Sequence, residues 1–379
     1  MNKIKKQSLA ALAAFGLTFG LVACGDDSSS SASDKVDVSL TGVVYTSDYK
    51  TGELRWIDKE GNVSEKSLSF HQDSKVVVDG ADLYVLEAIG ADNISKIDPE
   101  KLETEGKKAV TWQASLDDGS NPIDMAFDDD EAWVALQAAD SLVKISTKDG
   151  KVLKSIKTGK FSYKGETTPY VADIELNAGK LYVLMQRYTM DPTTWATTYP
   201  KGILAIYDAS TGDLKDTIQL KTKNPKAIII DDDAVYVATH GEYNAASGTD
   251  ADKKRGIEKI NESKKSSSLY ISGEELGGGV ANVVVEDGIA YVVLNLGYDE
   301  NWAAITEVKK VDLSSKKVEK IKDLSDASGS IAVADGKLYV GDRVDSKVVV
   351  WDGEKKSSLK QPKGTLPPYS IALFYSEQN

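Results

Sequence analysis

The fold is decided by a ten-residue pattern that reads Ile331-Ala332-Val333-Ala334-Asp335-Gly336-Lys337-Leu338-Tyr339-Val340. Two apolar runs flank an Asp-Gly pair, which favours a tight turn because both of its residues tolerate positive φ. The segment therefore predicts a β-hairpin whose second strand carries an aromatic residue.

The same pattern recurs along the chain. The second-strand aromatic appears seven times, 39 to 55 residues apart, as Tyr45, Tyr84, Trp133, Tyr182, Tyr236, Tyr291 and Tyr339. A third apolar segment follows each aromatic and ends at a turn-forming polar residue: Asp58, Asp98, Ser146, Asp208, Asn261, Asp312 and Asp352. A fourth strand follows, as at 152–156 and 214–220. Four strands at this period are typical of a β-propeller blade.

The two ends of the repeat region complete each other. The segment 368–374 matches the first strand of a blade and has no successors, while the repeat that begins at Thr41 has no first strand. Joining them protects two sheet edges that would otherwise be open to other chains. We therefore expect an all-β, seven-bladed propeller over residues 39–379, closed by the C-terminal strand.

The repeat resembles that of the YVTN-type seven-bladed propellers. It is carried by Asn121-Pro122, Asn224-Pro225, Tyr182-Val183 and 208–212, which reads Asp-Ala-Ser-Thr-Gly. The Asn that follows Tyr-Val in that family is missing from every blade. The resemblance implies a fold, since this fold carries binding modules, lactonases and scaffolds alike.

The N-terminal segment predicts export and lipidation. Three lysines precede an apolar stretch at 9–23, which is too short for a spanning helix and fits a signal peptide. It ends in Leu21-Val22-Ala23-Cys24, which resembles the lipobox of bacterial lipoproteins and implies a lipid on Cys24. We expect a signal peptide at 1–23, a lipidated Cys and Ser-rich tether at 24–38, membrane attachment through the lipid, and a place in the cell envelope at the outer membrane.

Charge and cysteine content exclude several functions. The net charge is −13, and removal of the three signal lysines leaves about −16, which repels nucleic acid. Cys24 is the only cysteine, so no disulfide or Cys-based metal cage can form within the chain. We expect a monomer that does not bind nucleic acid.

Three neighbouring repeats are longer than the others. Their extra residues lie between second and third strands, at 186–202, 239–256 and 295–304, and alternating strand direction places all of these connections on one face. They contain the aromatics Tyr188, Trp195, Tyr199, Tyr243, Tyr298 and Trp302, with Tyr163 and Tyr170 nearby. Rigid aromatic rings favour recognition, so we expect this face to bind a protein or glycan partner, with Trp195 and Trp302 as anchors. The alternative is that the rings pack within their own loops.

A second set of residues shares one register at the start of the first strands, which should line the central channel. It comprises Lys75, Asp124, Asp173, Ala227, Asn282, Ser330 and Ser370. Asp124, Asp173 and Asn282 could hold Ca²⁺, which prefers several oxygen ligands. The alternative is a water-filled polar channel without a cofactor, and we favour it.

Signatures of catalysis are missing. The chain has two histidines, His71 and His240, in different repeats, and it lacks a Gly-x-Ser-x-Gly elbow. We therefore expect a non-enzymatic binding or scaffold lipoprotein. The alternative function is a hydrolase or lyase that resembles propeller lactonases, with a divalent metal at the channel mouth.

Overall fold

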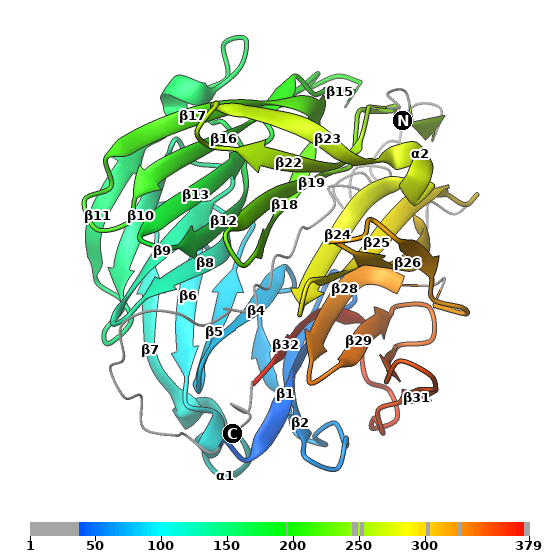
Figure 1. Ribbon diagram of the computed structural model, residues 1–379. Coiled ribbons are helices and arrows are strands. Elements are labelled where there is room, and N and C mark those ends of the chain that lie inside the picture. Colours follow the sequence, from blue (N-terminus) through cyan, green and yellow to red (C-terminus); the bar gives the residue numbers. More distant parts are fainter. Residues whose placement is uncertain are drawn as a thin grey trace, which may run out of the picture.

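The computed structural model describes residues 38–194, 196–244, 249–250, 254–300, 304–324 and 327–374. Seven four-stranded antiparallel sheets lie around a common centre (Figure 1), so the predicted seven-bladed propeller is confirmed. None of the helices in the described ranges has the length and apolar character needed to cross a bilayer.

Each blade runs from a first, innermost strand to a fourth, outermost strand. Blade 1 is β32 Pro368–Leu373, β1 Leu40–Ser47, β2 Gly52–Asp58 and β3 Leu68–Phe70; blade 2 is β4 Ser74–Asp79, β5 Asp82–Glu87, β6 Asn93–Ile97 and β7 Val110–Ser115. Blade 3 is β8 Pro122–Asp128, β9 Glu131–Leu136, β10 Ser141–Ser146 and β11 Val152–Lys157; blade 4 is β12 Val171–Asn177, β13 Lys180–Met185, β16 Lys201–Asp208 and β17 Leu214–Lys223. Blade 5 is β18 Pro225–Asp231, β19 Ala234–Thr239, β22 Gly256–Asn261 and β23 Ser266–Ser272. Blade 6 is β24 Gly279–Glu286, β25 Ile289–Tyr298, β26 Ala304–Asp312 and β27 Val318–Lys320; blade 7 is β28 Ala327–Ala334, β29 Lys337–Asp342, β30 Lys347–Trp351 and β31 Lys356–Ser358.

Short elements occupy the connections between these strands. Two small hairpins lie in the long connections of blades 4 and 5: β14 Thr189–Met190 with β15 Thr197–Thr198, and β20 Tyr243–Asn244 with β21 Thr249–Asp250. The helices are η2 Pro99–Lys101, α1 Leu102–Glu105, η3 Gly106–Ala109, η4 Gly159–Phe161 and α2 Gly273–Leu276.

The ring closes as the split repeat predicts. Strand β32 pairs antiparallel with β1, and its backbone places Ala372 opposite Val43. The described residues form seven buried apolar clusters, each contributed by two adjacent blades, including one between blades 7 and 1. The apolar core therefore lies between sheets all the way around the ring, as expected for strands that are buried on both faces.

The recurring turns and aromatics have the predicted roles. At Asp335-Gly336 both residues have positive φ, 52° and 68°, as a two-residue hairpin turn requires. The repeat aromatics fill the inter-blade clusters, and their polar ends reach the neighbouring blade: Trp133 Nε1 donates to the carbonyl of Ala209 at 2.9 Å. An aromatic at this position thus combines apolar burial with a directional bond between blades.

Blade 1 departs from the repeat in one respect. Its strand pairing places Ser370 opposite Tyr45, whereas Asp173 of blade 4 lies opposite Leu184, two residues beyond the aromatic Tyr182. Tyr45 is therefore displaced by two residues toward the face of the second-to-third connections. Its hydroxyl donates to the carbonyl of His71 at 2.5 Å there, and a Cβ at Gly52 would come within 1.9 Å of that hydroxyl oxygen. Only glycine fits at position 52 beside this ring.

Candidate functional site

The second-to-third connections of blades 4, 5 and 6 lie on one face, which we call the insertion face; they are long in blades 4 and 5, whereas the extra residues of blade 6 mainly lengthen strands β25 and β26. Each joins a second strand to a third strand, and these connections emerge on the same side because the strands alternate in direction. The starts of all first strands lie on this side too, so the mouth of the central channel opens among the insertions. The predicted placement of the insertions and the axial residues at one end is confirmed.

Aromatic rings form a small core inside the blade 4 insertion. Tyr170 and Tyr188 stack with ring centroids 3.8 Å apart, and Tyr199 packs on Tyr188 at 5.6 Å. Arg187 links this core to the connection between blades 3 and 4, since its Nε donates to the carbonyl of Phe161 at 2.6 Å. Tyr188 and Tyr199 are 8% and 7% exposed. The structure therefore places these two rings in the core of the loop, as the alternative interpretation expects, because a loop of this length can bury its own aromatics.

The other aromatics predicted to bind a partner fall into two groups. Tyr298, at the end of β25, is half-buried and keeps part of its ring on the surface. Trp195 and Trp302 lie outside the described residues, as does the side chain of Tyr243, so their predicted roles stay predictions.

Exposed apolar side chains gather on the insertion face, and sequence reasoning did not single them out. Five of the described exposed large hydrophobic residues lie in or beside second-to-third connections: Tyr49, Ile89, Leu296, Ile305 and Val344. They come from blades 1, 2, 6 and 7, so they extend beyond the insertions. Arg343 holds Tyr49 in place, with its guanidinium carbon 4.5 Å from the ring centroid. A single exposed aliphatic residue is unremarkable, but a set on one face indicates an interaction surface.

The residues predicted to share one position at the start of the first strands lie there in the structure. Several of their side chains form hydrogen bonds to the first strand of the next blade. Asp173 Oδ2 accepts a 2.6 Å hydrogen bond from the backbone N–H of Ile228 in the next blade. Asp124 Oδ2 accepts from the N–H of Ile174 at 3.3 Å, and Ser370 Oγ accepts from the N–H of Val76 at 3.1 Å. Bulges in the pairing of first and second strands precede the register residues of several blades, for example between Val171 and Asp173. A bulge redirects side chains locally, which brings these polar groups to the neighbouring strand.

Burial raises the pKa values of Asp124 and Asp173, and the charge between them favours a single proton shared by the pair. Burial raises the pKa of Asp124, and burial followed by the negative charge of Asp124 raises the pKa of Asp173 well above its usual range. Asp173 Oδ1 is buried and accepts no hydrogen bond from the described groups. Two carboxyl groups this close in a buried site cannot both be ionised without a large cost.

Three basic side chains complete the channel mouth. Lys75 lies beside the two carboxyl groups; burial lowers its pKa to about 8, although Asp124 and Asp173 oppose that change. Burial and then the charge of Lys75 lower the pKa of Lys226 to about 8 as well. His240 stays neutral, since burial and then the charge of Lys226 lower its pKa to about 3. The sequence offered one signal for Lys226, its place directly after Asn224-Pro225 at a first-strand entrance.

The predicted calcium ligands do not fit a calcium ion. Both Asp124 oxygens accept backbone N–H groups, Oδ1 from Met125 at 2.9 Å and Oδ2 from Ile174, and Asn282 Oδ1 accepts from Val283 at 2.8 Å. The raised pKa of Asp173 disfavours the ionised carboxylate that calcium binds, and the ammonium of Lys75 lies beside both carboxyl groups. Calcium requires six or more available oxygens. Within the described residues, no group of three or more His, Cys, Asp and Glu side chains could hold a metal.

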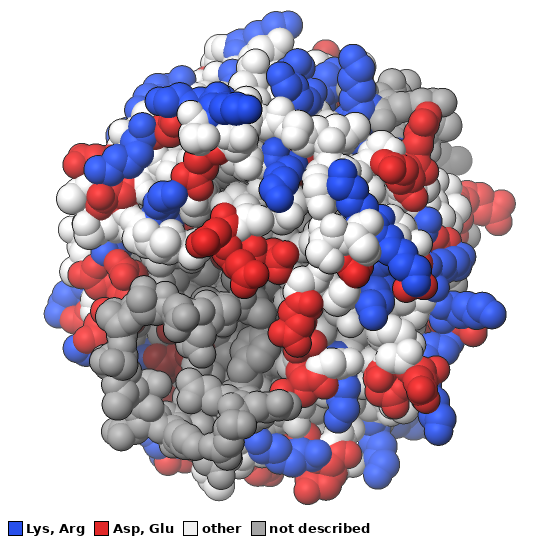
Figure 2. Space-filling model, viewed as in Figure 1, with Lys and Arg blue, Asp and Glu red and all other residues white. Residues whose placement is uncertain are grey.

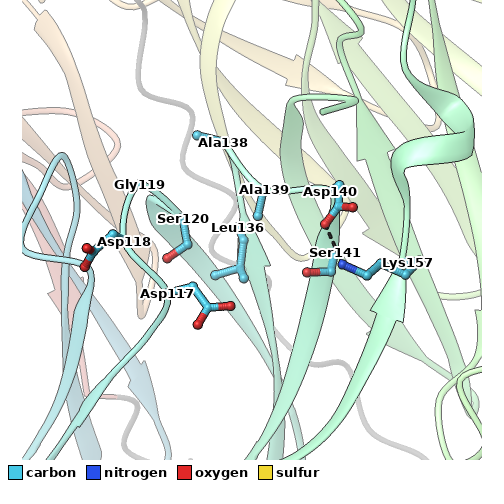
Figure 3. A pocket seen from close by; sticks show the side chains of 10 residues that line it. All are labelled: Asp117, Asp118, Gly119, Ser120, Leu136, Ala138, Ala139, Asp140, Ser141 and Lys157. Atoms are coloured by element: carbon cyan, nitrogen blue, oxygen red, sulfur yellow. Dashed lines mark hydrogen bonds and ion pairs between the residues drawn. The ribbon is translucent and has the colours of Figure 1, made fainter. Parts of the chain in front are cut away.

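A small recess lies between blades 2 and 3 on the insertion face (Figure 3). It has a volume of about 200 Å³ and lies between the connections at 116–121 and 137–140. Asp117 and Asp118 flank one side, and the ion pair of Asp140 with Lys157, 2.8 Å long, closes the other. These charged groups are largely exposed and therefore screened by water. The recess lacks the apolar enclosure of a typical small-molecule site.

Comparisons with known proteins support the fold alone. No protein-family profile and no curated protein sequence matches the chain. Among solved structures, AztD from Citrobacter koseri has a TM-score of 0.50 at 14% identity over 88% of this chain and 97% of that one. The Pan2 WD40 domain of Neurospora crassa has a TM-score of 0.54 at 12% identity, covering 87% and 94%, and the hydrazine synthase of Kuenenia stuttgartiensis has 0.50 at 14%, covering 73% and 75%. At this identity the similarity places the chain among β-propellers and assigns it no activity.

Proposed function

We propose that this chain is a non-enzymatic binding lipoprotein of the cell envelope, which presents the insertion face to a protein partner. One observation carries the proposal. Five blades have short second-to-third connections, whereas the adjacent blades 4 and 5 carry long ones at 186–200 and 240–255, and the blade 4 insertion has a packed core of its own. An ordered structure that the ring does not need is best explained by binding.

The exposed side chains favour a protein over a glycan. Among the described residues, the exposed large apolar side chains on the insertion face are mainly aliphatic, including Ile89, Leu296 and Val344. Sugar rings stack on flat aromatic surfaces, and the stacked rings of Tyr188 and Tyr199 are buried. Figure 2 shows acidic and basic side chains interspersed over much of the face in view, with acidic groups gathered beside the centre. Interspersed charge of this kind can orient a protein partner during encounter, whichever face that partner binds.

The path of the chain supports an orientation in which the insertion face points away from the membrane. Strand β1 begins at Leu40 and ends at Ser47, directly before a second-to-third connection, so Leu40 lies at the opposite end of the propeller. The backbone N–H of Ser39 donates to Glu100 Oε1 at 2.9 Å, and Glu100 lies in a third-to-fourth connection on that opposite side. A lipid on Cys24 would thus hold the opposite face toward the membrane. The Ser-rich composition of 24–38 predicts a tether that would span roughly 20 Å, which would leave the insertion face accessible.

The alternative of a metal-dependent hydrolase or lyase gains no support from the site. It requires an ion at the channel mouth, and all the side-chain oxygens assigned to that ion except Asp173 Oδ1 already accept backbone hydrogen bonds. The proposal therefore remains a binding protein.

The proposal is tested by a matched pair of surface variants. Leu296→Asp places a charge on the insertion face, and Leu269→Asp places one on outer strand β23; both leucines are 45% exposed. Full-length wild type and both variants are immobilised and exposed to envelope extract, and the bound proteins are identified. We expect one defined partner to be lost with Leu296→Asp and retained with Leu269→Asp. Equal retention by all three forms would place recognition elsewhere.

A further inference from the structure

Four basic side chains lie around the packed core of the blade 4 insertion. Lys160 and Lys164 belong to the connection 158–170, which joins the fourth strand of blade 3 to the first strand of blade 4. Arg187 begins the second-to-third connection of blade 4, and Lys201 begins strand β16 directly after it. Both connections emerge on the insertion face, because strands alternate in direction. We call this group of four cations the basic corner of the insertion face.

Contacts of Arg187 bring the two segments of the basic corner together. Its Nε donates to the carbonyl of Phe161 at 2.6 Å, and its Nη1 donates to the carbonyl of Lys201 at 3.3 Å. Its guanidinium carbon lies 5.7 Å from the ring centroid of Tyr163, and Lys164 Nζ lies 5.1 Å from the same centroid. The half-buried ring of Tyr163 therefore lies between two cations from different parts of the chain.

The backbone holds these side chains in fixed positions. The N–H of Arg187 donates to the carbonyl of Pro169 at 2.8 Å, and the N–H of Gln186 donates to the carbonyl of Tyr170 at 3.0 Å. Lys164, Tyr170 and Arg187 all have positive φ, at 46°, 54° and 62°. Such backbone conformations cost energy in residues other than glycine and persist where the surrounding structure enforces them. The basic corner is thus built before any ligand arrives.

The fold leaves the charge of the basic corner available. Within the described ranges of the chain, none of its four cations forms an ion pair with a carboxylate. Lys160, Lys164 and Lys201 are exposed, and Lys160 Nζ lies 5.1 Å from the ring centroid of Phe161. An exposed cation beside a ring gains only about 0.5 to 1 kcal/mol and keeps its charge. Arg187 uses Nε and Nη1, while no described residue accepts a hydrogen bond from Nη2.

Positive charge at this corner contrasts with the net charge of −13 on the whole chain. The carboxylates within 158–170 and 186–200 are Glu166 and Asp191, so the four cations outnumber them. Asp191 Oδ1 already accepts the backbone N–H groups of Thr193 and Thr194, each at 2.8 Å. Basic side chains also gather along the upper edge of Figure 2, where Figure 1 labels β15, β16 and β17. A local excess of positive charge on an acidic protein attracts anionic groups to that place and to few others.

We propose that the basic corner binds an acidic segment of the protein partner, a stretch of chain with several Asp and Glu side chains. The inference rests on the proposed function, because it names the chemistry that the partner presents to the insertion face. Arg187 Nη2 can donate to a carboxylate, while Lys160 and Lys164 act as point charges. An anionic glycan would meet the same charges, but the exposed aliphatic residues elsewhere on this face favour a protein.

Fluorescein-labelled octaglutamate is the probe, and its anisotropy is measured with the full-length protein at about 20 mM NaCl, where screening is weak. We expect wild type to bind the peptide and about 200 mM NaCl to weaken the binding. The double variant Lys160→Gln with Lys164→Gln removes two exposed cations and should weaken binding at least about fivefold, as the loss of two exposed charge pairs does. Its melting temperature should match that of wild type.

A matched control removes the same charge from the opposite face. Lys107 and Lys108 are exposed in η3, so Lys107→Gln with Lys108→Gln should bind octaglutamate like wild type. A linear polyuronate of matched charge replaces the peptide in a parallel titration and should bind more weakly. The proposal is overturned if wild type does not bind octaglutamate, if both double variants weaken binding equally, or if the polyuronate binds more tightly. Capture of a partner that Leu296→Asp abolishes does not depend on octaglutamate, so the proposed function and this inference fail separately.

Discussion

The carboxyl group of Asp173 in blade 4 accepts a 2.6 Å hydrogen bond from the backbone N–H of Ile228 in blade 5. This bond joins two first strands that have no backbone pairing to each other, and it is fully buried. Burial and the negative charge of Asp124 raise the pKa of Asp173 well above its usual range, which favours the neutral acid beside Asp124.

Asp173→Asn should therefore be tolerated, whereas Asp173→Ala should not. The amide oxygen of Asn can still accept from Ile228, and its NH₂ group can replace the proton donated to Asp124. Alanine leaves a buried N–H without a partner, which costs about 1 to 3 kcal/mol. Urea denaturation at neutral pH measures both free energies of unfolding. If Asp173→Asn proves as destabilising as Asp173→Ala, the inference that Asp124 and Asp173 share a proton is wrong.

Ring closure depends on the last described strand. Deletion of 366–379 removes β32, exposes the edge of β1, and removes Ile371 from the cluster between blades 7 and 1. Ile371→Ala alone should cost about 2 to 5 kcal/mol, because its side chain is 1% exposed. Thermal melting compares both forms with wild type. A deleted protein that melts like wild type would contradict closure by β32.

The blade 4 insertion should divide into a structural base and a dispensable tip. Replacement of the β14–β15 hairpin at 189–198 by a short turn keeps Tyr188 and Tyr199 and should leave the melting temperature nearly unchanged. Tyr188→Ala removes the ring stacked on Tyr170 and should destabilise the protein by about 3 kcal/mol, as loss of a buried aromatic does. Tyr188→Phe is the control and should behave like wild type. Equal destabilisation by the shortened hairpin would show that the tip supports the fold.

Acid should destabilise the protein partly through His240. Its native pKa of about 3 lies below the value of 6.5 for an unfolded histidine, so between these values the unfolded state binds a proton that the native state does not. The contribution is fully present above about pH 6.5 and is lost as the pH falls, by about 2 kcal/mol between pH 7 and pH 5. Urea denaturation of His240→Gln should show a pH dependence smaller by that amount. His71→Gln, at a partly exposed position, serves as the control and should keep the wild-type dependence.

Membrane attachment should depend on Cys24. In the proposed lipoprotein, Cys24→Ala removes the thiol that accepts the lipid, so the protein should stay unprocessed or appear in the soluble fraction. Fractionation with mass spectrometry of the N-terminal peptide measures both results. Wild-type and variant proteins with the same membrane fraction and the same processing would refute the anchor.

The propeller, its seven blades and its closure could be predicted from the amino-acid sequence. They follow from local chemistry repeated along the chain: Asp-Gly turns such as 335–336, β-branched runs and one aromatic per blade, each of which specifies a hairpin wherever it stands. The register of Asp124, Asp173 and Asn282 was also accessible, because strand alternation fixes which positions share an edge of the sheet.

The roles of those residues depend instead on contacts between distant parts of the chain. Whether Asp173 binds a metal or a neighbouring N–H depends on Ile228, 55 residues away, and on the proton it shares with Asp124. Tyr188 and Tyr199 could have been surface or core, and their packing with Tyr170 made them core. Lys75 and Asp124 lie far apart in the sequence, and their charges interact only because the first strands of blades 2 and 3 converge at the channel mouth. Burial and electrostatic coupling are properties of the assembled ring, so no local pattern could contain them.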